Sequence, residues 1–386
     1  MTVELWKTQH LPFTIGAMTT AENGPGLPGT LPFVLGFDDR LGLVRQVPDE
    51  SVTRYLARAY AVGSLLGTAM DDTPLGRHYA EDFVAFLERN VAQGIAGRRV
   101  LEVGAGRGFL LQCLQAKGAE CLGIEPGLAN APYWARYGVS VLADSFPSPR
   151  LSGNFDLVLA YAVLEHIAEP ADFLTAVIDS LRPGGMVAFS VPDCTPFIAA
   201  GDPAMLLHEH YMYFTADSLT RLFAYHGLRA LSVERAGYGG ALYVIAVRDP
   251  NIVAEEIAGA TEAETSTVMR YGGKCEALIE RVSTLVSRYA KSGRSLGIYC
   301  PARGLSFLPP DAAYRFFDDD PELTGRYYPP FKVPVESRER LIGSPVDELW
   351  ILSRTFGERL RGVLNAEPAL FGCCIRVLDE LVPEVE

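Results

Sequence analysis

Short apolar runs alternate with helical segments through the middle of the chain, and this pattern constrains the fold more than any other feature. The runs are rich in valine, leucine and isoleucine, and from residue 99 onward they read RVLEV, ECLGIE, FDLVLA and MVAFSV. Because they are apolar on both faces, they suit a parallel sheet covered by helices on each side. A turn at residues 182–185 (RPGG), a helix at 216–226 and an antiparallel edge pair, LRALSVE with ALYVIAV, complete this unit. The sequence predicts an α/β fold.

The segment before this core predicts a separate N-terminal module, because 386 residues are too many for one compact core. GPGLPGTLP at residues 24–32 is too dense in glycine and proline for a helix or a central strand, so this part should be loop-rich. Between Val52 and Glu88 the apolar residues return at helical spacing, with a break at residues 71–74. We therefore expect a loop-rich and helical module over residues 1–94.

The segment after the core predicts a third domain. We expect the core itself to cover residues 95–250 and the third domain residues 251–386. A helix should run over residues 252–290 with an interruption near Tyr271. Beyond it, apolar runs predict the strands of a second Rossmann-like α/β unit: SLGIYC, AYRFFDD, ELWIL and CIRVL.

Charge and cysteine content exclude several classes of partner. The formal net charge is −13 and no cluster of lysine and arginine occurs, which argues against binding to nucleic acid or to an anionic membrane. The seven cysteines include no CxxC pair, so neither a zinc ribbon nor a disulfide framework is expected. The chain shows no export signal and no apolar stretch of about 18 residues. We expect a cytoplasmic protein that acts on a small molecule, and leave its oligomeric state open.

A glycine-rich turn follows the first strand of the core, in RVLEVGAGRGFLLQCL. Gly104, Gly106 and Gly108 let the backbone approach a ligand closely, and the helix that starts next adds free amides and a positive dipole end. A dinucleotide site usually has a further glycine at the position that Phe109 occupies here. The turn therefore predicts a ligand at this point, and Phe109 disfavours a nicotinamide dinucleotide.

Two acidic residues narrow the nature of that ligand. Glu125 ends the next strand, about 20 residues after the turn, where a carboxylate can bind ribose hydroxyls. That position suits NAD and S-adenosylmethionine equally. Glu102 lies within the first strand, two residues before the turn, and suits a ligand that carries an ammonium group and no pyrophosphate.

Four motifs in order then resemble those of class I S-adenosylmethionine-dependent methyltransferases. They are EVGAGRG from Glu102, the acid Glu125, Asp144 in ADSFP, and FDLVLAYAVLEHI at 155–167. The resemblance implies a Rossmann-like core that uses S-adenosylmethionine as cofactor. It implies that the glycine turn holds the methionine part, that Glu125 binds the ribose and that Asp144 meets the adenine.

The flanking domains resemble those of three-domain sugar C-methyltransferases, which act on nucleotide-linked keto-deoxysugars. Residues 316–360 resemble the C-terminal domain of that family, and CPARGLSFL resembles its phosphate-approaching turn, which implies substrate contacts from Arg303 and Gly304. The family's N-terminal module binds zinc through four cysteines, and here it holds no cysteine, so no metal is expected. The helices at 60–83 still resemble that module, which implies substrate contacts from Tyr60 and His78.

The stretch LLHEHYMYFT at 206–215 has three interpretations. As a metal site it needs further ligands, and no other histidine or cysteine lies nearby in sequence. As a structural turn, its histidines would bond to backbone and its aromatic residues would pack. As a general base it would remove a carbon-bound proton next to a ketone, which a histidine with an ordinary pKa near 6.5 can accept at pH 7.

The resemblance favours the third interpretation. It implies that His210 is the base, that Glu209 assists it and that His208 contacts the substrate. The family usually has tyrosine where this chain has Leu207, so a hydroxyl that could orient or polarise the substrate is missing.

Two residues after the strand FDLVLA also have two interpretations each. We favour His166 as an ordinary wall residue over one that meets the methyl group. Tyr161 either shapes the sulfonium pocket, as we assign it, or caps the core.

We therefore predict an S-adenosylmethionine-dependent methyltransferase that methylates carbon on a keto-deoxysugar nucleotide or a related natural-product intermediate, through a base-generated enolate. The alternatives are transfer to oxygen or nitrogen of a sugar or small metabolite, and a non-catalytic protein that binds S-adenosylmethionine.

Overall fold

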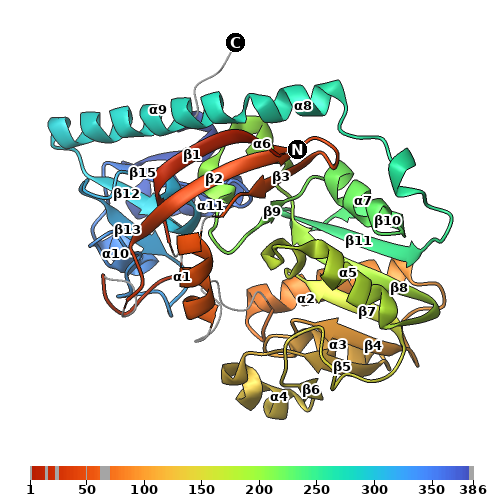
Figure 1. The fold of residues 1–386 in the computed structure, drawn as a ribbon. Coiled ribbons are helices and arrows are strands. Elements are labelled where there is room, and N and C mark those ends of the chain that lie inside the picture. The colour runs from red at the N-terminus through yellow and green to blue at the C-terminus, as the bar shows by residue number, and fades with distance from the viewer. Residues whose placement is uncertain (1, 14–15, 22–25, 49, 61–69, 382–386) are drawn as a thin grey trace.

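Three sheets make up the fold in the part of the chain that the structure describes (Figure 1). The structure is a computed structural model, and it describes residues 2–13, 16–21, 26–48, 50–60 and 70–381 apart from the side chains of residues 59, 60 and 303. A four-stranded sheet lies nearest the N-terminus, a seven-stranded sheet forms the middle, and a five-stranded sheet lies toward the C-terminus. The predicted domain boundaries at 94/95 and 250/251 stay predictions.

The seven-stranded sheet is the α/β core that the apolar runs predict. Its order is β10-β11-β8-β7-β4-β5-β6, and only β11 and β10 at one edge run antiparallel to their neighbours. The strand order reverses between β4 and β7, and ligands of open α/β sheets bind at the carboxyl ends of strands around such a point. The strands are β4 (Arg99–Val103), β5 (Glu120–Ile124), β6 (Val141–Leu142), β7 (Phe155–Tyr161), β8 (Leu181–Pro192), β10 (Leu228–Arg235) and β11 (Ala241–Arg248).

Helices cover both faces of this sheet because its strands are apolar on both sides. In β7, Leu157 and Leu159 pack with one face's helices, whereas Val158 and Ala160 pack with those of the other face. The first face carries α2 (Pro74–Asn90) and α3 (Phe109–Ala116), and the second carries α5 (Pro170–Asp179) and α7 (Ala216–Tyr225). A further helix of this unit is α4 (Ala131–Tyr137), with short 3-10 turns η1 (Leu128–Asn130) and η2 (Leu164–His166).

The predicted turn at residues 182–185 is wrong as a strand boundary. These residues belong to β8, where the pairing with β7 shifts register between Leu181 and Met186. Gly184 has a φ of +77°, so the chain bulges here without leaving the sheet. The glycine and proline signal marked an irregularity in a strand, which sequence alone does not distinguish from a turn.

The N-terminal module is mainly a sheet, so the prediction of a loop-rich module is wrong for most of it. The order β1-β2-β3-β9 is antiparallel throughout, and β2 begins at Thr30, inside the segment predicted as a loop. Alternate residues of β2, among them Phe33 and Leu35, are buried. The elements are β1 (Thr2–Pro12), β2 (Thr30–Asp38), β3 (Leu43–Gln46), α1 (Glu50–Tyr60) and, from much later in the chain, β9 (Met212–Tyr213).

The C-terminal sheet is parallel in the order β14-β13-β12-β15-β16, so its own order reverses between β12 and β15. The long helix begins at Glu262, where Thr261 forms a capping box, and not near residue 252 as predicted; it breaks at Arg270 as expected. The strand β14 was not predicted. The strands are β12 (Leu296–Tyr299), β13 (Arg315–Asp318), β14 (Val335–Ser337), β15 (Glu348–Ile351) and β16 (Cys374–Val377).

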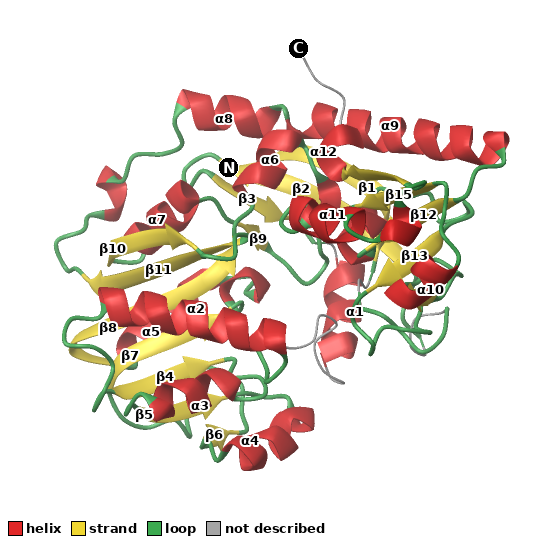
Figure 2. Ribbon diagram, turned by 180° about the vertical axis from the view of Figure 1, so that it is seen from behind, coloured by secondary structure: helices red, strands yellow, loops and turns green. Residues whose placement is uncertain are grey.

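Two helices connect the sheets along one side of the molecule. Figures 1 and 2 show α8 (Glu262–Met269) and α9 (Tyr271–Ser292) running past the N-terminal sheet to the C-terminal one. Buried residues of α9 pack into the cores of both of these sheets. The other elements are α6 (Thr195–Ala200), α10 (Arg338–Gly343), α11 (Gly357–Asn365), α12 (Leu378–Leu381), η3 (Pro203–Met205), η4 (Ala254–Glu256), η5 (Ala302–Ser306) and η6 (Pro368–Leu370).

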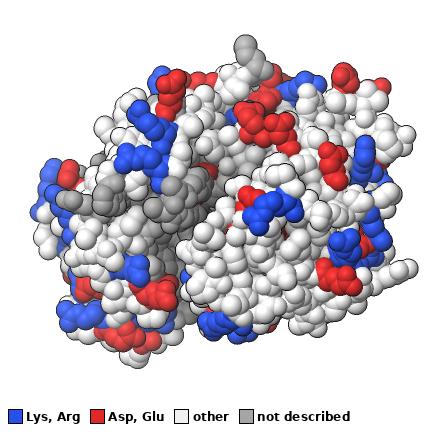
Figure 3. Space-filling view, turned by 60° about the horizontal axis from the view of Figure 1, so that its bottom comes forward, with Lys and Arg blue, Asp and Glu red and all other residues white. Residues whose placement is uncertain are grey.

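The surface agrees with the charge argument. On the face shown in Figure 3, basic and acidic side chains are interspersed and do not gather into one basic patch. Among the described residues, no helix is long and apolar enough to span a membrane.

Gly123 in the middle of β5 tests how tightly the core sheet and α3 pack. A Cβ there would lie 2.8 Å from both Ala105 Cβ and Leu111 Cδ1. Because overpacking a close-packed core costs about 1–3 kcal/mol, Gly123→Ala should lower the free energy of unfolding by that amount, measured in urea. The control is Gly362→Ala in α11. A Cβ at Gly362 would meet open space, so this variant should show no decrease in the free energy of unfolding. Equal stability of the two variants would contradict the packing argument.

Candidate active site

The predicted glycine turn joins β4 to α3 and is built on left-handed backbone. Gly104, Gly106 and Gly108 have φ values of +72°, +49° and +81°. A Cβ at Gly104 would lie 2.5 Å from Val163 Cγ2, so glycine there also lets the turn pack against the chain that follows β7. The indole of Trp134 donates to the Gly106 carbonyl at 2.8 Å and fixes the turn from the side.

Glu125 lies next to this turn, as predicted for a ribose-binding acid. Its carboxylate accepts hydrogen bonds from the backbone amides of Gly106 at 3.1 Å and Gly127 at 2.7 Å. These two bonds hold the side chain at the carboxyl end of β5, beside the point where the strand order reverses. The geometry thus brings the predicted turn and the predicted acid together.

Glu102 is a buried carboxylate with an unsatisfied oxygen. The residue is 3% exposed, and its Oε2 has no hydrogen-bond partner among the described residues. Burial raises the pKa of Glu102 well above its usual range, and the nearby charge of Glu125 raises it further. A buried acceptor without a partner is costly, so this position fits a ligand that brings a cationic donor, such as an ammonium group.

Asp144 lies after β6, on the far side of the predicted cofactor site. Its carboxylate accepts hydrogen bonds from Ser148 Oγ at 2.6 Å and from the Ser145 amide at 2.9 Å. The bond from Ser148 is the main reason that the pKa of Asp144 lies below its usual value, followed by that from Ser145. The carboxylate is therefore an ionised acceptor held at the end of the sheet.

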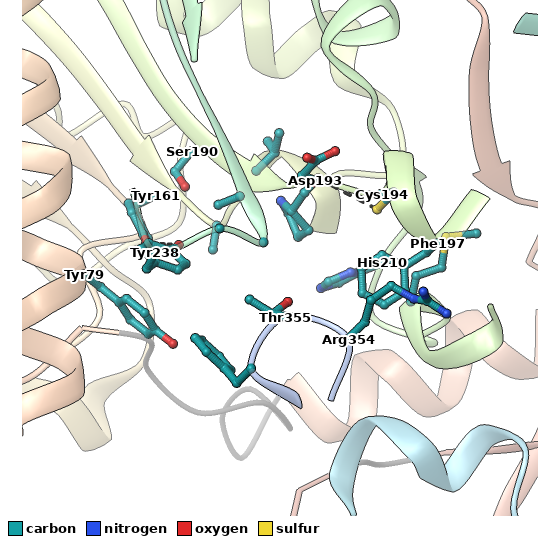
Figure 4. Close-up of a pocket in the computed structure, with 18 residues that line it drawn as sticks. Tyr79, Tyr161, Ser190, Asp193, Cys194, Phe197, His210, Tyr238, Arg354 and Thr355 are labelled. Carbon is teal, nitrogen blue, oxygen red and sulfur yellow. Dashed lines mark hydrogen bonds between the residues drawn. The ribbon is translucent and has the colours of Figure 1, made fainter. Parts of the chain in front are cut away.

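A cavity of about 260 Å³ lies beside this cofactor site, between two sheets. Figure 4 shows Tyr79, Tyr161 and Tyr238 on one side of it and His210 and Arg354 on the other. The chain after β7 and β8 forms one part of the wall, and residues 354–356 after β15 form another. The volume approaches that of pockets that hold small molecules.

The predicted residue Tyr161 lines this cavity at the end of β7. Its hydroxyl lies 2.9 Å from the hydroxyl of Tyr238, which comes from the turn between β10 and β11. Burial is the main reason that the pKa values of both phenols lie above their usual range, so both stay protonated at neutral pH. Tyr161 thus lines the cavity and also packs against the core, and its assignment to the sulfonium pocket stays a prediction.

The backbone around His210 is held by the N-terminal sheet. β3 pairs with β9, which follows the histidines directly, and the Gln46 amide donates to the Tyr211 carbonyl at 3.0 Å. With its side-chain nitrogen turned toward the segment, Gln46 also donates to the carbonyls of His208 at 3.1 Å and His210 at 3.0 Å. From the core side, the Tyr211 amide donates to the Glu165 carbonyl at 2.7 Å. The position of His210 is therefore fixed from two sides.

His210 belongs to a cluster with Glu165, His166 and Glu209, in which only His166 is partly exposed. The rings of His166 and His210 meet edge to face with their centroids 4.7 Å apart, and Glu209 Oε2 lies 3.8 Å from His166 Nδ1. Burial lowers the pKa of His166 to about 4, although the Glu209 backbone opposes this shift. His166 is therefore neutral at pH 7. It lies between the predicted helper Glu209 and the predicted base His210, and its predicted role as a wall residue stays a prediction.

The same cluster corrects the sequence argument about metals. Each of Glu165, His166 and His210 offers one ligand atom, and these atoms lie within 4.8 Å of one another. The absence of further ligands nearby in sequence therefore does not hold in space, because the end of β7 supplies them. A set of two imidazoles and a carboxylate suits Zn²⁺, Mn²⁺ or Fe²⁺.

Two of the predicted substrate-binding residues, His208 and His78, lie in different surroundings. His208 is 1% exposed and packs with Phe13 and Phe33 in the core of the N-terminal module, so the structure does not bring it to the cavity. His78 is exposed on α2, with its ring 6.4 Å from that of Tyr238, which does line the cavity. Both roles stay predictions.

The other three predicted substrate-binding residues are Gly304, Tyr60 and Arg303. Gly304 is buried, and a Cβ there would meet the side chain of Leu352, so close packing explains this glycine without a phosphate. The side chains of Tyr60 and Arg303 lie outside the described residues.

Sequence reasoning missed several residues at or near the cavity. Arg354 follows a strand that was predicted, and the rule that ligands bind at the carboxyl ends of strands could have found it. Gln46, Tyr79 and Tyr238 carried no comparable signal, because only the tertiary structure brings their elements to this place.

Comparison with known proteins gives one family model and several relatives. Residues 75–233 match the model described as a methyltransferase domain. The C-methyltransferase NovU of Streptomyces niveus is 25% identical over 286 residues, which cover 68% of this chain and 68% of NovU. The ubiquinone biosynthesis O-methyltransferase of Aromatoleum aromaticum is 35% identical over 115 residues, which cover 27% of this chain and about half, 47%, of that protein.

Solved structures with a similar fold include two with bound ligands. The 1,6-didemethyltoxoflavin-N1-methyltransferase of Burkholderia thailandensis is 19% identical with a TM-score of 0.39, and the match covers 56% of this chain and 96% of that one. The DhpI–SAH complex is 20% identical with a TM-score of 0.36, and the match covers 52% and 96%.

The buried carboxylate of Glu102 predicts a pH dependence of stability. Its pKa in the folded state is raised above the ordinary 4.5, so its contribution to stability is fully present below about pH 4.5 and is lost as pH rises through the folded pKa. Within that pH window the free energy of unfolding of the wild type should fall by up to about 1.4 kcal/mol per pH unit relative to that of Glu102→Gln. Urea unfolding of both proteins from pH 5 to pH 8 measures this difference. Glu120→Gln, an exposed change in the neighbouring strand, should show no such trend; a flat difference for Glu102→Gln as well would refute the assignment.

Proposed function

Because residues 75–233 are a class I S-adenosylmethionine-dependent methyltransferase domain, we propose that this methyltransferase transfers its methyl group to a carbon atom next to a ketone. The acceptor class that we propose is a nucleotide-linked keto-deoxysugar or a related natural-product intermediate. The similarity to a relative named as a C-methyltransferase, over 68% of both chains, supports transfer to carbon.

The residues present fit S-adenosylmethionine. The orphaned oxygen of Glu102 suits the ammonium group, Glu125 suits the ribose hydroxyls, and Asp144 suits the adenine. The methionine part would lie along the left-handed turn at residues 104–108, and Tyr161 would face the reactive end. When bound, S-adenosylmethionine supplies an electrophilic methyl group.

The observation that carries the proposal is the place of His210. Its side chain lines the cavity that the ends of β7 and β8 form, while its backbone is clamped by Gln46. A carbon-bound proton next to a ketone must be removed before that carbon can accept a methyl group, and a neutral imidazole can accept it. We assign His210 as this base.

Glu209 assists His210 through His166 in this mechanism. Because His166 is neutral and meets the His210 ring, it can orient that ring, and the Glu209 carboxylate can in turn stabilise the positive charge that His210 acquires. His210 and Glu209 are each only 3% exposed, so the cluster keeps water away from the reacting carbon.

Transfer to oxygen is the second candidate, and one observation favours it. The ligand atoms of Glu165, His166 and His210 lie close enough together to hold a divalent cation. A cation there would bind a hydroxyl of the acceptor and lower its pKa, which makes oxygen the nucleophile. The relative named as an O-methyltransferase is 35% identical over 115 residues, which supports the same candidate.

Replacing His210 tests the base assignment. His210→Asn should reduce turnover by about two to four orders of magnitude and slow the exchange of the acceptor's carbon-bound proton in D₂O, because both need the same proton removal. Binding of S-adenosylhomocysteine, measured by calorimetry, should stay within about twofold of the wild type, which corresponds to roughly 0.4 kcal/mol. The reason is that His210 lines the cavity and does not belong to the glycine turn. The control is His10→Asn on β1, an exposed change that should alter neither quantity. Full activity of His210→Asn would exclude His210 as the base.

Divalent cations separate transfer to carbon from transfer to oxygen. For transfer to carbon with His210 as base, turnover should be unaffected by EDTA, and Zn²⁺ or Mn²⁺ should at most inhibit, because a ligated imidazole cannot accept a proton. For transfer to oxygen, EDTA should abolish turnover and Mn²⁺ should restore it. Turnover with a keto-deoxysugar nucleotide in the presence and absence of EDTA, with the methylated atom identified by NMR, distinguishes the two. Loss of activity in EDTA together with an O-methyl product would overturn the proposed transfer to carbon.

A further inference from the structure

The cavity lies where two sheets each present the carboxyl ends of their strands. In the seven-stranded sheet these are the ends of β7 and β8, and in the C-terminal sheet it is the end of β15, next to the point where the strand order reverses. Ligands of parallel α/β sheets bind at such ends. The three residues that β15 contributes to the wall are Arg354, Thr355 and Phe356, and only Arg354 is charged.

The guanidinium of Arg354 is held in one orientation. Its Nε donates to Asp202 Oδ2 at 2.7 Å, and its Nη1 donates to Asp379 Oδ1 at 2.6 Å. Asp202 is fully buried before η3, while Asp379 is an exposed residue of α12. The guanidinium carbon also lies 5.9 Å from the centre of the Phe197 ring, another wall residue. The Arg354 side chain is 12% exposed, so its donors are fixed before any acceptor arrives.

One nitrogen of this guanidinium is left over. Nη2 is buried and has no hydrogen-bond partner among the described residues. A buried donor without a partner costs about 1–3 kcal/mol, and such a group in a wall residue points to a ligand oxygen. Because Asp202 and Asp379 already offset the positive charge, a carbonyl or enolate oxygen suits this donor better than a phosphate with two negative charges.

We propose that Arg354 binds the ketone oxygen of the acceptor and stabilises the negative charge that forms on it, an inference that rests on the proposed transfer to carbon. His210 takes the proton from the neighbouring carbon, and the electron pair of that C–H bond forms the enolate C=C bond while the C=O π pair moves onto the oxygen beside Arg354. The carbonyl then reforms as the carbon bonds to the methyl group given up by S-adenosylmethionine, which leaves S-adenosylhomocysteine.

Arg354 can also take the place of the hydroxyl group that is missing at Leu207. The resemblance to sugar C-methyltransferases suggested a tyrosine hydroxyl before the first histidine, and Leu207 is instead a buried core residue. Arg354 reaches the cavity from the C-terminal sheet, while His210 reaches it from the methyltransferase core (Figure 4). Base and oxyanion donor therefore come from different parts of the chain.

The test measures enolate formation by itself. A nucleotide-linked keto-deoxysugar is incubated in D₂O with S-adenosylhomocysteine, and exchange of its carbon-bound proton is followed by NMR. Arg354→Lys keeps a cation beside Asp202 but loses the fixed fork of donors, so exchange should slow by about 10²–10³-fold, as for loss of one oxyanion donor. Binding of S-adenosylhomocysteine should stay within about twofold of the wild type.

Two further variants separate this role from a structural one. Asp379→Asn removes an exposed ion-pair partner of Arg354 and leaves Nη2 in place, so exchange should stay within about threefold of the wild type, since exposed pairs contribute less than about 1 kcal/mol. If Arg354→Lys does not fold, the double variant Asp202→Asn with Arg354→Gln removes both buried charges together and should show the same slow exchange.

The outcomes are distinct. Exchange at the wild-type rate in a folded Arg354 variant overturns the role of Arg354 and leaves the proposed function standing. An equal loss of exchange in Asp379→Asn overturns it as well, because the effect then follows the ion pairs and not Nη2. If the wild type itself neither exchanges nor methylates the ketone, the proposed transfer to carbon fails and the role of Arg354 fails with it.

Discussion

The backbone clamp on residues 208–211 is the interaction on which the candidate active site depends. β3 and the Gln46 side chain bind this segment from the N-terminal sheet, and the Glu165 carbonyl binds it from the core. Buried backbone groups must find partners, so these bonds also satisfy the polar atoms of a segment that enters no long strand. The clamp comes from residues far away in the sequence, so the N-terminal module, which contains no cysteine, fixes the backbone of the histidine segment.

Burial sets the protonation states around the cavity, and the groups respond in opposite senses. It lowers the pKa of His166 and keeps that imidazole neutral, whereas it raises the pKa of Glu102 and of the phenols Tyr161 and Tyr238. In each case burial favours the neutral form. The two candidate functions differ in what an imidazole of the cluster binds: a proton taken from carbon, or a divalent cation.

The cavity lies where the carboxyl ends of strands from two sheets meet. The seven-stranded core supplies Tyr161 and His210 to its wall, and the C-terminal sheet supplies Arg354 across the same cavity. The buried Asp202, which precedes η3, holds that guanidinium, so the ion pair that joins the two parts also orients the donor.

The sequence by itself determined the βα core, the glycine turn with Glu102 and Glu125, and the histidine segment, because each depends on local pattern and short spacing. Hydrophobic alternation fixes strands, and a turn between a strand and a helix fixes which backbone amides face a ligand. Only the tertiary structure decided that the N-terminal module is a sheet, that His208 is core, and that Glu165, His166, Tyr238 and Arg354 share a site with His210. The physical reason is that strand pairing and the convergence of strand ends join residues that lie up to hundreds of positions apart, and no local pattern records which of them meet.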